Sequence, residues 1–304
     1  MSTPVPSGRQ LEISHGGQRA TVVEVGGGLR QYHVNGREVL DRYGIEERCT
    51  AARGLPLVPW PNRIADGQYS FGGHTYQLPL TEPEKNNAIH GLLRWRNWSC
   101  QAHEVDRVRM AIRLYPMMGY PFTLDVEVEY QLADTGLTVS TTATNRSDEP
   151  CPYAAGQHPY ISSGPDRVDQ CHLQFDATQW LPTDTRGIPT GIEHIEGSPV
   201  DFRAGRLIGS QDIDYTFTDL HRDAEGLAWV NITGPHGQRT SVWLDEHYPY
   251  LEIFTSHTLA SRHWRTGLGV EPMTAPPNGF RTGIGVLSLE PGQSVTSLWG
   301  MQAD

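Results

Sequence analysis

Residues 122–144 read Phe122-Thr-Leu-Asp-Val-Glu-Val-Glu-Tyr-Gln-Leu-Ala-Asp-Thr-Gly-Leu-Thr-Val-Ser-Thr-Thr-Ala-Thr144, and this stretch decides the fold class. Apolar and polar residues alternate on both sides of Ala133-Asp-Thr-Gly136. A period of two is the pattern of a strand with one buried face, and Asp and Gly are favoured in tight turns. The stretch therefore predicts two antiparallel strands joined by a turn.

The same period recurs along most of the chain. It covers 20–25, 29–34 and 37–40, with the hairpin dipeptide Asn35-Gly36 between the last two, and 68–78 around Gly72-Gly73. Further strands are predicted at 109–115, 171–175, 227–233, 240–244, 250–255 and 284–289. Helical periodicity is nearly absent, and only 41–48 suggests one short helical turn.

This spacing of strands favours a sandwich or a barrel over βαβ units. We predict an all-β fold with very little helix, formed as a single large antiparallel β-sandwich. No linker divides the chain, so one domain is expected over 1–304, with 1–10 as a flexible N-terminal segment.

Composition excludes several classes of partner. The 304 residues include 24 Lys and Arg against 35 Asp and Glu, a net charge of −11 that would repel nucleic acids and anionic membranes. The N-terminal residues lack the pattern of a signal peptide, and no apolar run is long enough to span a bilayer. Four widely spaced cysteines without a C-x-x-C pair are expected to be reduced thiols. We expect a cytoplasmic, soluble protein.

Four short polar motifs lie next to strand-like sequence: Asn62-Arg-Ile64, His90-Gly91, His158-Pro-Tyr160 and Glu271-Pro272. Glu271 follows the apolar run 267–270, where desolvation raises the pKa of a carboxylate and can make it a general base. An edge salt bridge is the alternative for Glu271. Taken alone, His90 is better explained as a turn residue, and His158 is as well explained as a structural histidine as by a functional role.

Two further residues belong with these motifs. Arg63 follows Pro59-Trp-Pro-Asn62, a rigid segment, and its guanidinium could pair with a carboxylate or bind sugar hydroxyls. Asp214, considered alone, reads as part of a solvated acidic loop. There is no phosphate loop, no H-E-x-x-H zinc motif and no G-x-S-x-G nucleophile motif. We therefore predict proton transfer on a neutral, hydroxyl-rich substrate, with no metal or cofactor.

Taken in order, these motifs resemble the aldose 1-epimerase (galactose mutarotase-like) family. The resemblance runs from about residue 15 to the C-terminus and is carried by 59–78, Asn87-Ala-Ile-His-Gly91, Gly156-Gln-His-Pro-Tyr160, Asp214-Tyr-Thr-Phe217 and Val270-Glu-Pro-Met-Thr-Ala-Pro-Pro-Asn278. It implies a large antiparallel β-sandwich with a sugar cleft, and an isomerase that interconverts the α and β anomers of a hexose.

The resemblance also implies a role for each site residue. Glu271 is expected to be the general base and His158 the general acid. Arg63, His90 and Asp214 are expected to hold the sugar, and Tyr160 and Trp243 to line the cleft. The chemistry requires an ionised Glu271 and a protonated His158, and we expect the acidity of the protein to help keep the imidazole charged. The expected partner is a small aldohexose, bound by a monomer or a homodimer.

Some residues depart from the family pattern. Leu92-Leu-Arg-Trp-Arg-Asn97 replaces a glycine-rich run, and the segment 273–280 resembles a bacterial subgroup to which sulfosugar mutarotases are assigned. Arg63, Arg94 and Arg96 could meet an anionic sugar, sulfonated or phosphorylated, although solvation at the surface is the favoured role for Arg94 and Arg96. Two other hypotheses are a non-catalytic carbohydrate-binding module on the same fold and glycoside hydrolysis by Asp214 and Glu271.

Overall fold

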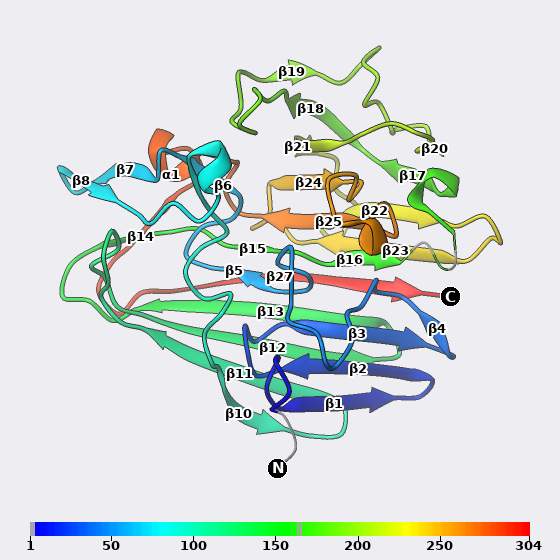
Figure 1. The fold of residues 1–304 in the computed structure, drawn as a ribbon, viewed down its shortest axis with the longest axis horizontal. Helices are drawn as coiled ribbons and strands as arrows, with labels where there is room; N and C mark the ends of the chain where they lie inside the picture. Colours follow the sequence, from blue (N-terminus) through cyan, green and yellow to red (C-terminus); the bar gives the residue numbers. More distant parts are fainter. Residues whose placement is uncertain (1–3, 163, 165) are drawn as a thin grey trace.

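The computed structural model describes residues 4–162, 164 and 166–304. The fold is all-β, as predicted, with two large antiparallel sheets and several small ones (Figure 1). Within the described residues, no helix is long and apolar enough to cross a membrane. All four cysteines are free.

The first large sheet has nine strands, and the predicted pair at 122–144 lies within it as β12 and β13. In spatial order its strands are β10 (Ser99–His103), β11 (Arg107–Leu114), β12 (Leu124–Ala133), β13 (Gly136–Asn145), β27 (Ser294–Ala303), β23 (Arg239–Leu244), β22 (Ala228–Thr233), β17 (His172–Phe175) and β20 (Arg206–Leu207).

The second large sheet has eight strands and carries two of the four polar motifs, His158-Pro-Tyr160 and Glu271-Pro272. In order they are β19 (Glu193–His194), β18 (Ala177–Leu181), β21 (Asp214–Leu220), β24 (Tyr250–Phe254), β25 (Gly267–Met273), β15 (Gly156–Gln157) and β5 (Pro56–Leu57), with β16 (Tyr160–Ser162) also paired to β25.

The remaining elements are small. A four-stranded sheet contains β1 (Gln10–His15), β2 (Gln18–Val23), β3 (Leu29–Val34) and β4 (Arg37–Glu38). Three strand pairs are β6 (Arg63–Ala65) with β9 (Asn87–Ile89), β7 (Gln68–Phe71) with β8 (His74–Gln77), and β14 (Cys151–Tyr153) with β26 (Leu287–Leu289). The helical pieces are η1 (Pro83–Lys85), η2 (Val168–Gln170), η3 (Ser261–His263) and α1 (Gly279–Thr282).

Two local expectations differ from the structure. Residues 41–48 form turns and irregular backbone without a helix, and the Glu47 carboxylate accepts a hydrogen bond from the Gly44 amide there. Of the expected flexible segment 1–10, residues 1–3 lie outside the described residues. Ser7 is buried and accepts a hydrogen bond from the Val25 amide, so the described end of this segment packs against the fold.

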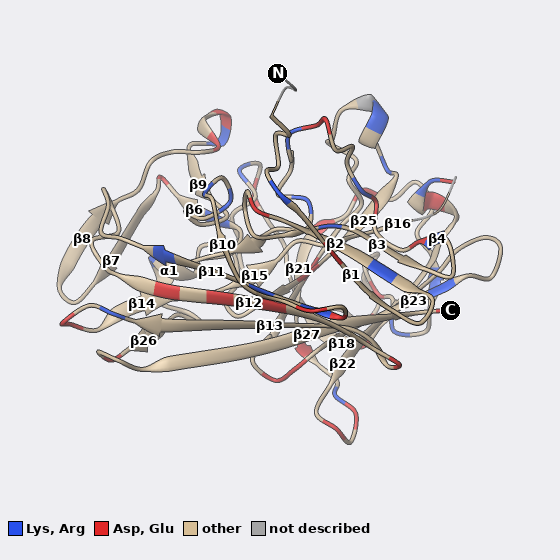
Figure 2. Cartoon of the chain, turned by 90° about the horizontal axis from the view of Figure 1, so that it is seen from below, with Lys and Arg blue, Asp and Glu red and all other residues tan. Residues whose placement is uncertain are grey.

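Alternation in the sequence places the core between the two large sheets. Along β12, Val126 and Val128 are fully buried, whereas the alternate residues Glu127 and Glu129 face away from the core. Figure 2 shows acidic positions along this strand in red. The same apolar cluster includes Ile253 of β24 from the second sheet. Each such Val or Ile contributes roughly 1.5–3 kcal/mol by leaving water, so this shared core holds the two sheets together.

Strand β25 differs from β12 because both of its faces are buried. Leu268 and Val270 belong to the core cluster, whereas Gly269 and Glu271 point to the opposite face. A Cβ on Gly269 would lie 3.3 Å from Oε1 of Glu271 and 3.1 Å from Cβ of Phe254. The missing side chain at Gly269 therefore leaves space beside the Glu271 carboxylate.

Backbone hydrogen bonds join motifs that are about two hundred residues apart in the sequence. The amide of Asn278 donates to the Arg63 carbonyl, and the Asn278 side chain accepts from the Ala65 amide at 3.0 Å. Phe280 then packs on Trp60, with ring centroids 5.7 Å apart. These contacts fix strand β6, and with it Arg63, relative to the end of β25.

The His90-Gly91 motif makes a close backbone approach that only glycine permits. Gly91 has φ +69°, and a Cβ there would lie 2.1 Å from the Val58 carbonyl oxygen. We expect Gly91→Ala to lower the free energy of unfolding by about 2–5 kcal/mol through left-handed strain and overpacking, measured by urea denaturation. Gly72→Ala is the control, since φ is +57° there but nothing lies within 4 Å, and it should cost about 1–2 kcal/mol. Equal losses in the two variants would contradict the close approach at Gly91.

Candidate active site

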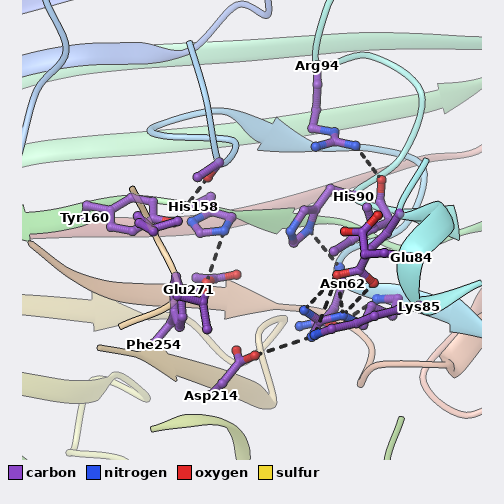
Figure 3. Close-up of a pocket in the computed structure, with 16 residues that line it drawn as sticks. Asn62, Glu84, Lys85, His90, Arg94, His158, Tyr160, Asp214, Phe254 and Glu271 are labelled. Atoms are coloured by element: carbon purple, nitrogen blue, oxygen red, sulfur yellow. Dashed lines mark hydrogen bonds and ion pairs between the residues drawn. The ribbon is translucent and has the colours of Figure 1, made fainter. Parts of the chain in front are cut away.

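A cavity of about 440 Å³ opens beside the polar face of β25 (Figure 3). This volume falls within the range of small-molecule sites. Six of the seven site residues predicted from the sequence line it: Arg63, His90, His158, Tyr160, Asp214 and Glu271. They come from β6, the loop after β9, the turn between β15 and β16, the start of β16, β21 and β25.

The structure does not bring the seventh residue, Trp243, to this cavity. Trp243 lies on β23 of the nine-stranded sheet, where it pairs with Trp229 and Gly300. Its ring covers Gly300, whose added Cβ would come within 2.5 Å of the indole. Phe254 of β24 is the aromatic residue that lines the cavity together with Tyr160.

Glu271 and His158 form a buried pair on the cavity floor. Oε1 of Glu271 lies 3.3 Å from Nε2 of His158, and the two side chains are 3% and 5% exposed (Figure 3). Among the described residues, Oε2 of Glu271 and Nδ1 of His158 are buried without a hydrogen-bond partner. Buried polar atoms are normally satisfied, so unpaired atoms on two adjacent groups that line a cavity make this pair a candidate binding site for a polar ligand.

Burial determines the protonation of this pair. It raises the pKa of Glu271, and any negative charge on the neighbouring Glu252 and Asp214 carboxyl groups adds to the effect. Burial, together with the charges of Arg53 and Arg94, lowers the pKa of His158 to about 3. These two shifts favour an uncharged pair, in which the one proton that can move between the two groups rests on Glu271.

This result corrects the expectation that the acidity of the protein keeps His158 charged. The net charge of −11 is spread over the whole chain, whereas the charges that lower the pKa of His158 belong to Arg53, Arg94 and Arg63. Local cations and desolvation outweigh distant surface carboxylates, because water and salt screen the latter.

Stacked rings fix the orientation of His158. Tyr160 stacks on the imidazole with centroids 4.9 Å apart and planes 12° apart. The Arg53 guanidinium lies over the Tyr160 ring, 4.2 Å from its centroid, and forms an ion pair with Asp41. Tyr160 also donates to the Ala51 carbonyl at 3.2 Å. The imidazole therefore cannot rotate away from Glu271 without disrupting this stack.

Hydrogen bonding also defines the state of His90. Its Nδ1 accepts a hydrogen bond from the Asn62 amide at 3.2 Å. Burial lowers the pKa of His90 well below its usual value, and His158, Arg94 and Arg63 lower it further, so the ring is neutral. A neutral ring with an accepting Nδ1 carries its proton on Nε2. His90 therefore presents an N–H donor at the cavity.

Arg63 is held by two carboxylates. Its Nε and Nη2 bind Glu82 at 3.0 and 3.1 Å, and its Nη1 lies 3.6 Å from Oδ2 of Asp214. Burial alone would lower the pKa of Arg63, but Asp214 and Glu82 raise it. The pair with Glu82 fixes the guanidinium, which in turn orients Asp214 at the cavity wall.

Several residues near the site escaped the sequence analysis or received no role there. For Glu82, the sole sign of a role in the site was its position in the loop before His90. The sequence around Arg53 gave no such sign. The favoured prediction for Arg94, solvation at the surface, is wrong, because this side chain is buried and lines the cavity. Glu252 lies within the predicted strand 250–255 but received no role there. In the structure it is buried on β24, directly opposite Glu271.

Comparison with known proteins identifies relatives of this chain. A family model described as aldose 1-epimerase matches residues 9–301. The uncharacterized protein YihR of Escherichia coli (strain K12) is 36% identical over 94% of this chain and 91% of its own length. The aldose 1-epimerase of the same organism is 30% identical over 67% of this chain and 60% of its own length.

Solved structures agree on the fold. The GalM/aldose epimerase homologue from C. elegans superposes with a TM-score of 0.87 at 21% identity, covering 97% of this chain and 98% of that chain. A galactose mutarotase-like protein from Clostridium acetobutylicum gives a TM-score of 0.85 at 20% identity, with coverages of 96% and 94%. At these identities the likeness concerns the fold alone.

Proposed function

The chain belongs to the aldose 1-epimerase family, and we propose on that basis that it interconverts the α and β anomers of a hexose. One observation carries the proposal: a buried carboxyl and a buried imidazole lie 3.3 Å apart on the floor of a cavity, each with an unpaired polar atom. Members of this family are isomerases, and anomer exchange needs one acid and one base.

The short separation suits the atoms that react. In a hemiacetal, the C1 hydroxyl and the ring oxygen are bonded to the same carbon, so an acid and a base placed side by side can reach both. Glu271 removes the proton from the C1 hydroxyl while His158 gives a proton to the ring oxygen. The C1–O bond to the ring breaks and its electron pair stays on the ring oxygen, which leaves an open-chain aldehyde.

Ring closure reverses these transfers. After rotation about the C1–C2 bond, the hydroxyl formed from the former ring oxygen attacks the other face of the aldehyde. His158 takes back its proton, and Glu271 returns the other proton to the new C1 hydroxyl. No proton is gained or lost over the cycle, so the pair regains the proton count with which it began.

The proton must first move from Glu271 to His158. The two arrangements of the pair contain the same single proton and differ only in its position along the contact between Oε1 and Nε2. Hydroxyl groups of a bound sugar would donate hydrogen bonds to the unpaired oxygen of Glu271, and such bonds favour the ionised carboxylate. Substrate binding thus supports the catalytic arrangement. His90, Arg63 and Asp214 hold the remaining hydroxyls.

Exchange NMR across a panel of neutral, phosphorylated and sulfonated hexoses tests this proposal. The protein should accelerate interconversion of the two anomeric C1 protons of at least one sugar well above the rate in buffer. A wild-type protein that accelerates exchange for no aldose would refute the enzymatic function and would leave carbohydrate binding as the alternative.

A second candidate, exchange of an anionic hexose, is favoured by Arg94. This residue lines the cavity but is 8% exposed, and its Nη2 donates to the Ile89 carbonyl at 2.8 Å (Figure 3). Its buried Nε has no hydrogen-bond partner among the described residues. Burial lowers the pKa of Arg94 to about 10, so the group stays charged at neutral pH. A buried cation with a free donor would suit a sulfonate or a phosphate.

Replacing Arg94 with glutamine separates the two candidates. If the substrate is anionic, R94Q should lower kcat/KM for that sugar about 10- to 100-fold, the effect of a lost hydrogen bond to a charged group, and change the value for a neutral hexose little. R96Q is the matched control, because Arg96 is exposed and bonds Met117 instead of lining the cavity. An unchanged ratio between the two sugars in R94Q would remove the anionic candidate.

A further inference from the structure

Glu252 lies in the same row of the second sheet as the proposed base. Thr216 of β21 is the register partner of Glu252 on β24, and Glu252 is the partner of Glu271 on β25. Partners in a row point to the same face, and so does Asp214, two residues before Thr216. Three carboxyl groups therefore meet at one corner of the cavity, with Glu252 behind the two that line it.

The charges at this corner do not balance if all the carboxyls are ionised. Arg63 is the cation that faces them, and it already binds Glu82 at 3.0 Å and lies 3.6 Å from Asp214. Among the described residues, Glu252 is in no ion pair and is 2% exposed. A buried, unpaired carboxylate is costly, and such a group takes up a proton instead.

The groups around Glu252 mostly act in the same direction. Burial raises the pKa of Glu252, and the Asp214 carboxylate adds to the effect, whereas the Thr216 hydroxyl and Arg63 oppose it. The Thr216 hydroxyl donates to Oε2 of Glu252. A side-chain hydrogen bond with Asp214 also raises the pKa of Glu252, and because such a bond between two carboxyl groups requires a proton, a protonated Glu252 has an acceptor in Asp214.

We propose that Glu252 is a positioning residue of the reaction: as a neutral carboxylic acid it donates a hydrogen bond to Asp214 and holds that carboxylate at the cavity wall. Its neutrality also leaves Glu271 without a charged neighbour on β24. This role rests on the proposed function, since it assumes that Asp214 binds the sugar and that Glu271 accepts a proton from it.

Glutamine and alanine at position 252 test the two parts of the role. E252Q keeps a donor for Asp214 and an acceptor for Thr216, so kcat and KM should stay within about threefold of wild type. E252A removes both hydrogen bonds, and its KM should rise about tenfold while kcat changes less. Thr216→Val removes only the donor to Glu252, so it should raise KM by less than E252A does. Circular dichroism and thermal unfolding establish that each variant is folded.

The pH profile distinguishes a neutral Glu252 from an ionised one. Activity is lost on the alkaline side when the single proton shared by Glu271 and His158 is removed. If Glu252 is neutral, E252Q leaves this limb where it is in the wild type. If Glu252 is ionised, E252Q removes a negative charge, lowers the pKa of Glu271 and moves the limb to lower pH, which would overturn the proposal. A hundredfold loss of kcat in folded E252Q would also overturn it.

Infrared difference spectroscopy tests the proton on Glu252 without relying on activity. At pH 7 the wild type should show a carbonyl band of a protonated carboxylic acid that is missing in E252Q and present in E271Q. Absence of any such difference in E252Q would refute the neutral carboxyl even if the enzyme is active. If the band is present but no sugar is exchanged, the proposed function fails and the protonation of Glu252 stands.

Discussion

Replacing Glu271 with glutamine should lower kcat for anomer exchange about 10²–10⁴-fold, the contribution of one positioned proton-transfer group. Glutamine has nearly the same shape, but its amide cannot accept a proton from the C1 hydroxyl. Sugar affinity should change little, because His90, Arg63 and Asp214 remain in place. Exchange NMR gives the rate, and calorimetric titration gives the affinity.

The matched control for this variant is Glu84→Gln. Glu84 also lines the cavity, but it is exposed on η1 and far less constrained than Glu271. E84Q should exchange anomers at nearly the wild-type rate. If E271Q stays as active as E84Q, Glu271 is not the base, and a base must be sought among the other carboxyls of the cavity.

Replacing His158 with asparagine should have a loss of similar size, about 10²–10⁴-fold in kcat. The side chain then has no nitrogen that can give a proton to the ring oxygen and take it back. Loss of the ring also removes the stacking partner of Tyr160, so the thermal unfolding of H158N must be compared with that of the wild type.

His90→Gln provides the comparison for His158. The glutamine side chain can still donate a hydrogen bond, and His90 is assigned to holding the sugar, so H90Q should raise KM more than it lowers kcat. A double variant H158N/E271Q should be little worse than either single variant, because both groups serve one proton relay. Fully multiplicative losses would contradict a single relay.

The fold class could be predicted because the deciding information is local. The alternation at 122–144 specifies β12 and β13 within one or two residues, and Asn35-Gly36 and Gly72-Gly73 specify two hairpins. Turn residues and period-two patterns act over a few positions, so a single sequence is enough to read them.

The site could be predicted only in part, because it is assembled by register between distant strands. Glu252 belongs to the site because it pairs with Glu271, 19 positions away on another strand. The residues next to Glu252 in the sequence do not indicate this pairing. Trp243 shows the opposite case. Its alternating strand is real, but that strand belongs to the other sheet, and a sequence pattern does not specify the sheet that a strand joins.

The protonation of the pair could not be predicted from charge counts. Arg53 lies over the Tyr160 ring, which stacks on His158, and that stack depends on the tertiary fold. Composition gives the net charge of the whole molecule, whereas a buried group responds to the few charges within several ångströms of it.

The contact between Asn278 and strand β6 has a consequence for the biosynthesis of this protein. Arg63 is made early and Glu271 and Asn278 late, so the two halves of the cavity come together only after most of the chain has been synthesised. Contacts over such long sequence separations form slowly. Nascent chains released before position 278 would thus contain Arg63 without the contact that fixes strand β6, and the proposed site is completed only at the last stage of synthesis.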